Sequence, residues 1–202
     1  MEWKLPWGTS KAVRGHENYL ARLTEIHEEM NDPEEPLLSW GYHRIWHGEL
    51  SRAILDAIAP DRPVLVWQRS FHEMYLNSAG IRWLELDEEE VDRHHQVDIA
   101  NGRFFEMGKL MLLEKLNPYL LDPTRFMQGL ERLKQVVRLG GHTTVGDMGI
   151  GIFDLDMEWS SIRAVLDTED TPFRIAMIPR VALATDVEKE MDRLVDMRSL
   201  AT

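Results

Sequence analysis

The alternation of strand-like and helix-like segments in the last third of the sequence limits the fold most strongly. We expect strands at 143–148 and 173–178, a helix at 156–166, and a last helix from a cap at Thr185 or Asp186 to Ser199. The connections between these segments are short. A strand, a helix and a second strand in this order favour a right-handed crossover, which makes the two strands parallel. The sequence therefore predicts α/β structure in this region.

The preceding part of the chain mixes helical and strand-like segments. Ser51 and Asn77 or Ser78 are predicted helix N-caps, and Asp122-Pro123 is a helix start followed by an apolar stripe that ends at Gly140. The apolar run 63–68 predicts a strand that is buried on both faces. We interpret 36–48 as a loop, and we expect helices at 15–30 and 103–116. The predicted organisation is a mixed α/β module at 1–139 and two β/α units at 140–202.

Composition narrows the classes of function. The 202 residues carry a net charge of -12, which argues against a nucleic-acid partner because phosphate binding requires a basic surface. No apolar run approaches the roughly 20 residues that cross a bilayer, so no membrane partner is expected. The chain has no cysteine, which excludes disulfides and thiolate metal ligands. These features fit a cytoplasmic protein.

Two sequence segments together resemble the amidohydrolase family 3 group of metal-dependent hydrolases, of the N-substituted formamide deformylase and exoenzyme regulatory protein type. The first segment contains the strand 63–68, then His72, then Asn77-Ser78-Ala79. The second is Gly140-Gly141-His142-Thr143-Thr144-Val145-Gly146-Asp147. The resemblance rests on the order and spacing of these motifs, and it extends from about Trp7 to Arg180.

The resemblance implies that the chain is an internal piece of a larger (β/α)₈ barrel. Residues 1–139 would be mostly the insertion after the first barrel strand, and residues 140–202 would be two early β/α units of an incomplete TIM barrel. The family's His-x-His metal motif would lie upstream, and its later histidine ligands and final aspartate downstream. Because two β/α units cannot close a barrel of eight, we expect the chain to form a homo-oligomer or to associate with the missing barrel parts.

The chemistry that the resemblance implies is hydrolysis of non-peptide carbon–nitrogen bonds in a small amide-type or formamide-like substrate. A divalent metal such as zinc would activate water in the complete parent enzyme. No metal is expected in this chain, since its sequence lacks the His-x-His motif. The chain by itself is therefore expected to be inactive.

His72, Asn77 and Asp147 are the substrate-pocket candidates. His72 follows a strand end by a few positions, where α/β proteins place functional side chains. The alternative is a structural role, in which it holds the Asn77-Ser78 turn through a hydrogen bond. Asp147 is predicted at the carboxyl end of a parallel strand, the active-site rim of a barrel. Its alternative role is to cap the following turn or helix.

Three further residues are secondary candidates for a metal site. His43 and His47 are four residues apart and precede Glu49, a spacing that places two imidazoles on one face of a helix. Glu106 matches a glutamate of the family and could approach a metal in the complete enzyme. The alternatives are a loop for the two histidines and a solvent-exposed carboxylate for Glu106.

Two other functions remain open at this stage. The chain could be a free-standing, non-catalytic α/β binding or regulatory module derived from an amidohydrolase. It could also be a hydrolase that builds a site across an oligomer interface from His43, His47 and His72.

Overall fold

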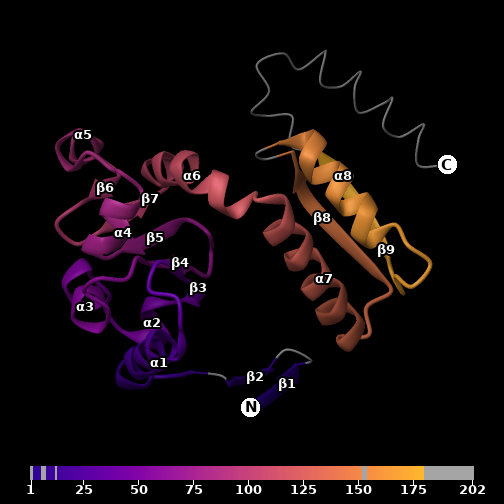
Figure 1. Cartoon of the computed structure of the whole chain (residues 1–202), viewed down its shortest axis with the longest axis horizontal. Helices are drawn as coiled ribbons and strands as arrows, with labels where there is room; N and C mark the ends of the chain where they lie inside the picture. Colours follow the sequence, from indigo (N-terminus) through magenta and orange to yellow (C-terminus); the bar gives the residue numbers. More distant parts are fainter. Residues whose placement is uncertain (1, 6–7, 12, 152–153, 180–202) are drawn as a thin grey trace. The chain divides into compact units, whose positions relative to one another are not determined.

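The computed structural model describes residues 2–5, 8–11, 13–151 and 154–179 (Figure 1). The chain divides into two compact units, Met1–Leu116 (unit 1) and Asn117–Thr202 (unit 2). Helices and strands occur in both, which confirms the predicted mixed α/β class. The sequence-based division at Gly140 falls at the end of helix α7, whereas α7 groups in space with the segments that follow it, because it packs on α8.

Unit 1 is built around a five-stranded mixed sheet of order β3-β4-β5-β7-β6. Strand β3 pairs with β4 in parallel, and the other neighbours are antiparallel. The strands are β3 (Leu37–Tyr42), β4 (Val64–Gln68), β5 (Glu73–Leu76), β6 (Val97–Asp98) and β7 (Arg103–Phe105). A separate antiparallel pair, β1 (Glu2–Leu5) and β2 (Gly8–Lys11), precedes them.

Two helices of unit 1 begin directly after the N-cap residues predicted from the sequence. Ser51 accepts a hydrogen bond from the Ile54 N–H, and Asn77 accepts one from Gly80, so both predicted N-caps are confirmed. The helices are α1 (His16–Glu29), α2 (Arg44–His47), α3 (Arg52–Ile58), α4 (Ser78–Trp83), α5 (Glu88–Asp92) and α6 (Met107–Leu120).

Two predictions for unit 1 were wrong. The segment 36–48 is not a loop but β3 followed by the short helix α2, because β3 gains its hydrogen bonds from the buried strand β4. The helix expected at 103–116 begins only at Met107, since residues 103–105 pair with β5 as β7. Both errors come from strand pairing between distant segments, which overrides local propensity.

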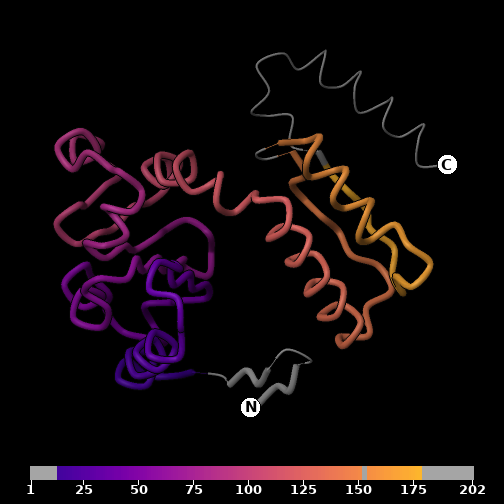
Figure 2. Tube along the Cα trace, viewed as in Figure 1, coloured from indigo at the N-terminus to yellow at the C-terminus, as the bar shows by residue number. Residues whose placement is uncertain are grey.

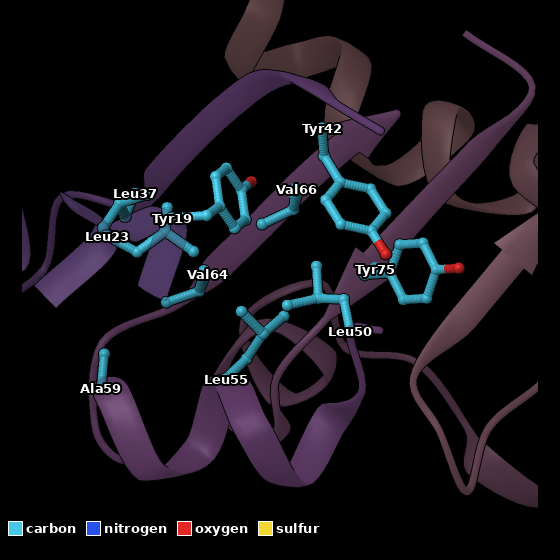
Figure 3. Packing of buried hydrophobic residues seen from close by; sticks show 10 residues of the cluster. All are labelled: Tyr19, Leu23, Leu37, Tyr42, Leu50, Leu55, Ala59, Val64, Val66 and Tyr75. Atoms are coloured by element: carbon cyan, nitrogen blue, oxygen red, sulfur yellow. The ribbon is translucent and has the colours of Figure 1, made fainter. Parts of the chain in front are cut away.

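One face of this sheet packs against α1 and α3 (Figure 3). Tyr19 and Leu23 of α1 and Leu55 of α3 meet the inward side chains of the strands. The members of this buried cluster are Tyr19, Leu23, Leu37, Tyr42, Leu50, Leu55, Ala59, Val64, Val66 and Tyr75. The opposite face is buried as well at Leu65, Met74, Leu76 and Phe104. Strand β4 is thus buried on both faces in its first half, as predicted.

Unit 2 contains α7 (Pro123–Leu139), β8 (Thr144–Ile150), α8 (Leu155–Leu166) and β9 (Arg174–Pro179). The Asp122 carboxylate caps α7 and Pro123 opens it, as the sequence predicts. Strands β8 and β9 are parallel, with Thr144 opposite Arg174, which confirms the expected strand–helix–strand unit (orange to yellow in Figure 2). The predicted last helix lies outside the described residues.

Among the described residues of unit 2, side chains pack on one face of the β8–β9 sheet. Leu130 and Val137 of α7 and the apolar side of α8 pack on it, together with Val145, Ile175 and Met177. On the other face every described side chain is exposed, with Met148 at 73% and Ile178 at 49%. We call this the uncovered face; it consists of Thr144, Gly146, Met148, Arg174, Ala176 and Ile178.

Among the helices formed by the described residues, none combines the length and the apolar character that crossing a bilayer requires.

Candidate functional site

Two residues with an unusual backbone conformation lie at one end of the sheet in unit 1. Phe71, in the turn between β4 and β5, has φ of 64°, and Glu106, between β7 and α6, has φ of 47°. They are two of the three non-glycine residues with positive φ in the described chain. This backbone conformation is unfavourable for L residues, and residues that adopt it are found more often at functional sites.

Hydrogen bonds hold both conformations in place. The Phe71 carbonyl accepts from the Trp67 indole N–H at 3.4 Å and from the Lys109 ammonium. The Glu106 N–H donates to the His72 carbonyl at 2.9 Å. Hydrogen bonds therefore join the β4–β5 turn to the start of α6.

His72 and Glu106 form the central pair of the site. Nδ1 of His72 lies 3.0 Å and 3.1 Å from the two carboxylate oxygens of Glu106. A carboxylate only accepts hydrogen bonds, so Nδ1 carries a proton, and in the neutral tautomer with this proton Nε2 is the acceptor. Both side chains remain more than half exposed, at 63% and 53%. The sequence singled out each residue separately, and the structure brings them together.

Three aromatic side chains contact one another near this turn, and one of them belongs to Phe71, which directly precedes His72 in the chain. Trp40 and Trp67 are direct neighbours on the parallel strands β3 and β4. Phe71 stacks on Trp40 at 5.5 Å between ring centroids and meets Trp67 edge-on at 5.3 Å. We call Trp40, Trp67 and Phe71 the aromatic edge. Sequence analysis did not single them out, although Trp67 near the end of the predicted strand 63–68 was an available signal.

Asn77 lies at 0% exposure and uses its whole amide group inside the protein. Its Oδ1 accepts from the Val64 and Gly80 N–H groups at 2.9 Å and 2.7 Å. Its Nδ2 donates to the carbonyls of Ala59 and Arg62 at 2.7 Å and 2.8 Å. These four bonds join β4, α4 and the α3–β4 connection, which makes Asn77 a structural centre of unit 1 in this conformation.

Glu73 and Arg103 form an ion pair on the neighbouring strands β5 and β7. The Arg103 guanidinium donates to Glu73 at 2.8 Å and 3.2 Å, and the Tyr75 hydroxyl donates to it at 3.0 Å. Burial raises the pKa of Glu73, but the bonds from Arg103 and Tyr75 outweigh it and hold the pKa below its usual value. The carboxylate is therefore kept charged, and it ties together the two strands that lead to the His72–Glu106 pair.

His43 and His47 serve the local structure of α2. The His43 ring caps the helix by accepting from the Ile45 N–H at 3.2 Å. His47 accepts from the His43 N–H through Nδ1 at 3.0 Å, and its Nε2 lies 3.2 Å from the Val13 carbonyl. Burial lowers the pKa of His47, which keeps the ring neutral. Both nitrogens of His47 are thus occupied, and this ring has no lone pair to offer a metal in this arrangement.

Asp147 lies in the middle of β8. Because side chains alternate along a strand, it shares the face of Val145, which packs toward the helices, rather than the uncovered face. Its Oδ1 accepts from the Gly149 N–H at 3.1 Å, a turn-stabilising bond of the kind that the capping alternative anticipated.

Glu158 is a buried carboxylate that the sequence analysis missed. It is 7% exposed and accepts from the N–H groups of Gly151 and Asp154 at 2.7 Å and 3.1 Å. It therefore fastens both ends of the loop that follows β8. A glutamate in the first turn of a helix was the available signal, since such residues commonly bond back to the N-terminal backbone.

The donor groups in the described residues do not fit a metal ion by themselves. A bound divalent metal needs several histidine or carboxylate ligands. Among residues 2–5, 8–11, 13–151 and 154–179, no three such side chains come together in a ligating arrangement. His72 and Glu106 provide two adjacent groups that bind each other.

Comparison with known proteins identifies a fold but no sequence family. No protein-family model matches the chain, and no curated protein sequence matches it either. Two solved structures are similar: uncharacterized metal-dependent hydrolases from Pyrococcus horikoshii OT3 (TM-score 0.59, 16% identity) and Pyrococcus furiosus (TM-score 0.56, 19% identity). The matches cover 87% and 88% of this chain.

The same matches cover only 33% and 34% of the two hydrolases. The chain thus spans about a third of the length of these structures and shares the fold of that portion. At such low identity the likeness concerns the fold alone.

Proposed function

We propose that this chain is part of a metal-dependent hydrolase that cleaves non-peptide carbon–nitrogen bonds in small amide-type or formamide-like substrates. In this proposal unit 1 belongs to the insertion and unit 2 supplies two early β/α units of a TIM barrel. The observation that carries the proposal is the uncovered face of β8 and β9. The likeness to one third of two metal-dependent hydrolases supports it.

A parallel two-stranded sheet with one bare face is an incomplete structure. Parallel sheets occur almost always with both faces buried, because their crossover helices cover one side and other side chains cover the other. In a closed barrel the helices lie outside and the opposite face fills the interior. Thr144, Met148 and Ile178 would then be interior residues, and the outer edges of β8 and β9 would pair with neighbouring strands.

The same feature supports association in solution. Met148 and Ile178 expose large apolar side chains beside strand edges with which no described strand pairs, and such edges are sites of edge pairing and aggregation. We propose that the chain as given associates with itself, or with the missing barrel parts where they are present.

In the complete enzyme, the residues of this chain would position substrate rather than hold the metal. The resemblance to amidohydrolase family 3 places the metal ligands in segments before and after this sequence. In its neutral form, His72, oriented by Glu106, would offer Nε2 as a hydrogen-bond acceptor for the N–H of an amide or formamide. Water activation stays with the groups outside the chain.

The decisive experiment reads the coding sequence on both sides of the chain. The proposal expects a His-x-His motif upstream in the same frame and further histidines and an aspartate downstream. The extended protein should then bind a divalent metal stoichiometrically and hydrolyse simple formamides. Stop codons directly flanking the chain, with no metal bound by the purified protein, would refute it.

Glu106→Gln in the extended protein tests the role given to the pair. The glutamine keeps the shape of the side chain but also offers an amide N–H to His72, so the tautomer is no longer enforced. We expect KM to rise with little loss of metal content. The exposed carboxylate Glu114 provides the matched control, Glu114→Gln, which should leave KM unchanged.

A non-catalytic α/β binding or regulatory module is the alternative. The observation in its favour is that unit 1 has its own core and a sheet with both faces buried at β4 and β5. Flanking stop codons together with a monomeric, metal-free protein would support this alternative. A site shared between subunits through His43, His47 and His72 is less favoured, because the ring nitrogens of His47 are already occupied.

A further inference from the structure

We propose that Asn101, in the turn between β6 and β7, is a site of spontaneous deamidation, and that Asp98 restrains this reaction. The turn covers residues 99–102 and ends in Asn101-Gly102. An asparagine followed by glycine is the dipeptide most open to deamidation, since glycine has no side chain that hinders attack by its own amide nitrogen. The inference does not depend on the hydrolase activity proposed above.

The fold requires a glycine directly after Asn101. Gly102 has φ of 63°, and a Cβ at this position would lie 2.1 Å from the Leu76 carbonyl oxygen. A backbone carbonyl cannot move aside as the end of a flexible side chain can, so no larger residue fits here. Asn101 itself is exposed, so solvent water reaches its side chain. The structure thus joins an exposed asparagine to a glycine that cannot be replaced.

Hydrogen bonds engage the groups of this dipeptide that react. Nδ2 of Asn101 donates to Oδ2 of Asp98 at 2.8 Å, and the Asn101 backbone N–H donates to Oδ1 of Asp98 at 3.1 Å. The Gly102 N–H donates to the Ile99 carbonyl at 3.1 Å. The nucleophile and the leaving group are therefore both bonded while the turn is closed, and the reaction proceeds when the turn opens locally. Asp98 supplies two of the bonds that oppose this opening.

The reaction uses only groups of this turn and water. The Gly102 amide nitrogen loses its proton and attacks Cγ of Asn101, so that a C–N bond forms and a five-membered succinimide ring closes. The bond between Cγ and Nδ2 of Asn101 breaks, and Nδ2 leaves with that proton as ammonia. Water then adds to one of the two ring carbonyls and opens the ring to aspartate or isoaspartate.

The isoaspartate product disturbs contacts that hold unit 1 together. Its main chain runs through Cβ and Cγ, so the backbone gains one methylene between residue 101 and Gly102. The Asn101 carbonyl accepts from the Arg52 N–H at 2.8 Å, and the Gly102 carbonyl accepts from the Leu76 N–H at 2.8 Å. These two bonds connect the turn to the first residue of α3 and to the end of β5. We therefore expect the isoaspartate form to be less stable than the unmodified protein.

Peptide mapping by mass spectrometry tests the inference on the full chain. Incubation at mildly alkaline pH should raise the mass of the peptide that contains Asn101 by the difference between an amide and a carboxyl group. The product should separate into aspartate and isoaspartate forms. Asn77-Ser78 is the internal control, because Asn77 is fully buried with its amide bonded at both ends, and it should stay unmodified. No change in mass at Asn101, or aspartate as the sole product, would overturn the proposal.

Asp98→Ala tests the restraint. This variant removes both hydrogen bonds from Asn101 to Asp98, so we expect deamidation about tenfold faster than in the parent chain, the factor for two ordinary hydrogen bonds. Asp98→Asn keeps one side-chain oxygen as an acceptor and should accelerate the reaction less. Asp92→Ala, at an exposed carboxylate of α5, is the matched control and should leave the rate unchanged. Circular dichroism checks that each variant is folded, and equal rates in Asp98→Ala and the parent would contradict the restraint.

The effect on unit 1 is measured on the modified protein itself. Ion exchange separates the deamidated chain, which carries one more negative charge, from the unmodified chain. The isoaspartate fraction should melt at a lower temperature than the unmodified fraction of the same preparation. Equal melting temperatures would show that the turn does not hold α3 and β5 in the way proposed.

Discussion

The sheets of the two units differ in how completely they are covered. In unit 1, Val64, Leu65 and Val66 of β4 are at most 1% exposed, so this central strand is buried from both sides. In unit 2, β8 alternates between half-buried and exposed residues, and Met148 is 73% exposed. The central strand of unit 1 is thus covered on both faces, whereas unit 2 leaves one face and two strand edges of its parallel sheet without partners among the described residues. This contrast is the basis of our proposal that unit 2 is completed by further chain or by another chain.

The largest expected effect is on the closed unit, through Asn77→Ala. The change leaves the N–H groups of Val64 and Gly80 and the carbonyls of Ala59 and Arg62 without their buried partner. We expect the free energy of unfolding of unit 1 to fall by about 3–5 kcal/mol. Urea denaturation followed by circular dichroism measures it. Asn18→Ala, at an exposed asparagine of α1, should change it by less than about 0.5 kcal/mol. A loss below 1 kcal/mol at Asn77 would remove it as the structural centre of unit 1.

Lys134→Ala tests a buried polar side chain of unit 2 that, like Asn77 in unit 1, joins several segments by hydrogen bonds. The buried Lys134 ammonium donates to the Asp170 carboxylate at 2.8 Å, the Thr168 hydroxyl at 3.1 Å and the Val165 carbonyl at 3.3 Å. We expect a loss of about 2 kcal/mol, typical of hydrogen bonds that involve a charged group. Arg132→Ala, an exposed position on the same helix, is the control. Equal effects of the two substitutions in thermal melts would show that the anchor contributes nothing.

Glu73→Gln tests whether a charged pair stabilises unit 1, because the effect of this substitution on stability should depend on pH. The pKa of Glu73 is depressed in the folded state, so the charged pair with Arg103 stabilises unit 1 above the unfolded pKa of about 4.3. That contribution disappears as the pH falls through the folded pKa. We expect the variant to lose about 1 kcal/mol at pH 7, a modest value because both partners are partly exposed, and to match the parent protein in acid.

Melting temperatures of the parent and of Glu73→Gln, measured from pH 7 down to pH 3, give this difference directly. Glu25→Gln, which breaks an exposed pair with Arg22, serves as the control and should show no difference at any pH. A Glu73→Gln effect that persists unchanged at pH 3 would assign the stabilisation to packing instead of charge.

The smallest effect on stability, and the most direct test of the uncovered face, is expected from Met148→Glu. An exposed position tolerates the charge, so the free energy of unfolding should change by less than about 0.5 kcal/mol. Self-association should nevertheless weaken, since a carboxylate on this face opposes apolar contact between copies. Sedimentation velocity measures the change, with Ser160→Glu on the exposed side of α8 as the charge-matched control. A parent chain that sediments as a monomer would contradict the proposed self-association.

Local signals in the sequence predicted much of the scaffold. Ser51, Asn77 and Asp122 cap helices as expected, because a cap depends on side-chain and backbone groups within one turn. The parallel pairing of β8 and β9 followed from the order of strand, helix and strand. The loop expected at 36–48 failed because β3 is stabilised by β4, a partner more than twenty positions away in the chain.

The sequence by itself determined the α/β class, the buried strand β4 and the strand–helix–strand unit, since these depend on apolar periodicity and on groups close together in the chain. The tertiary structure alone decided which polar side chains meet. His72 and Glu106 are 34 positions apart and come together only because β5 pairs with β7. In the same way, the pleat and pairing of β8 decided that Asp147 shares the helix-facing side with Val145, since one step along a strand reverses the direction of a side chain.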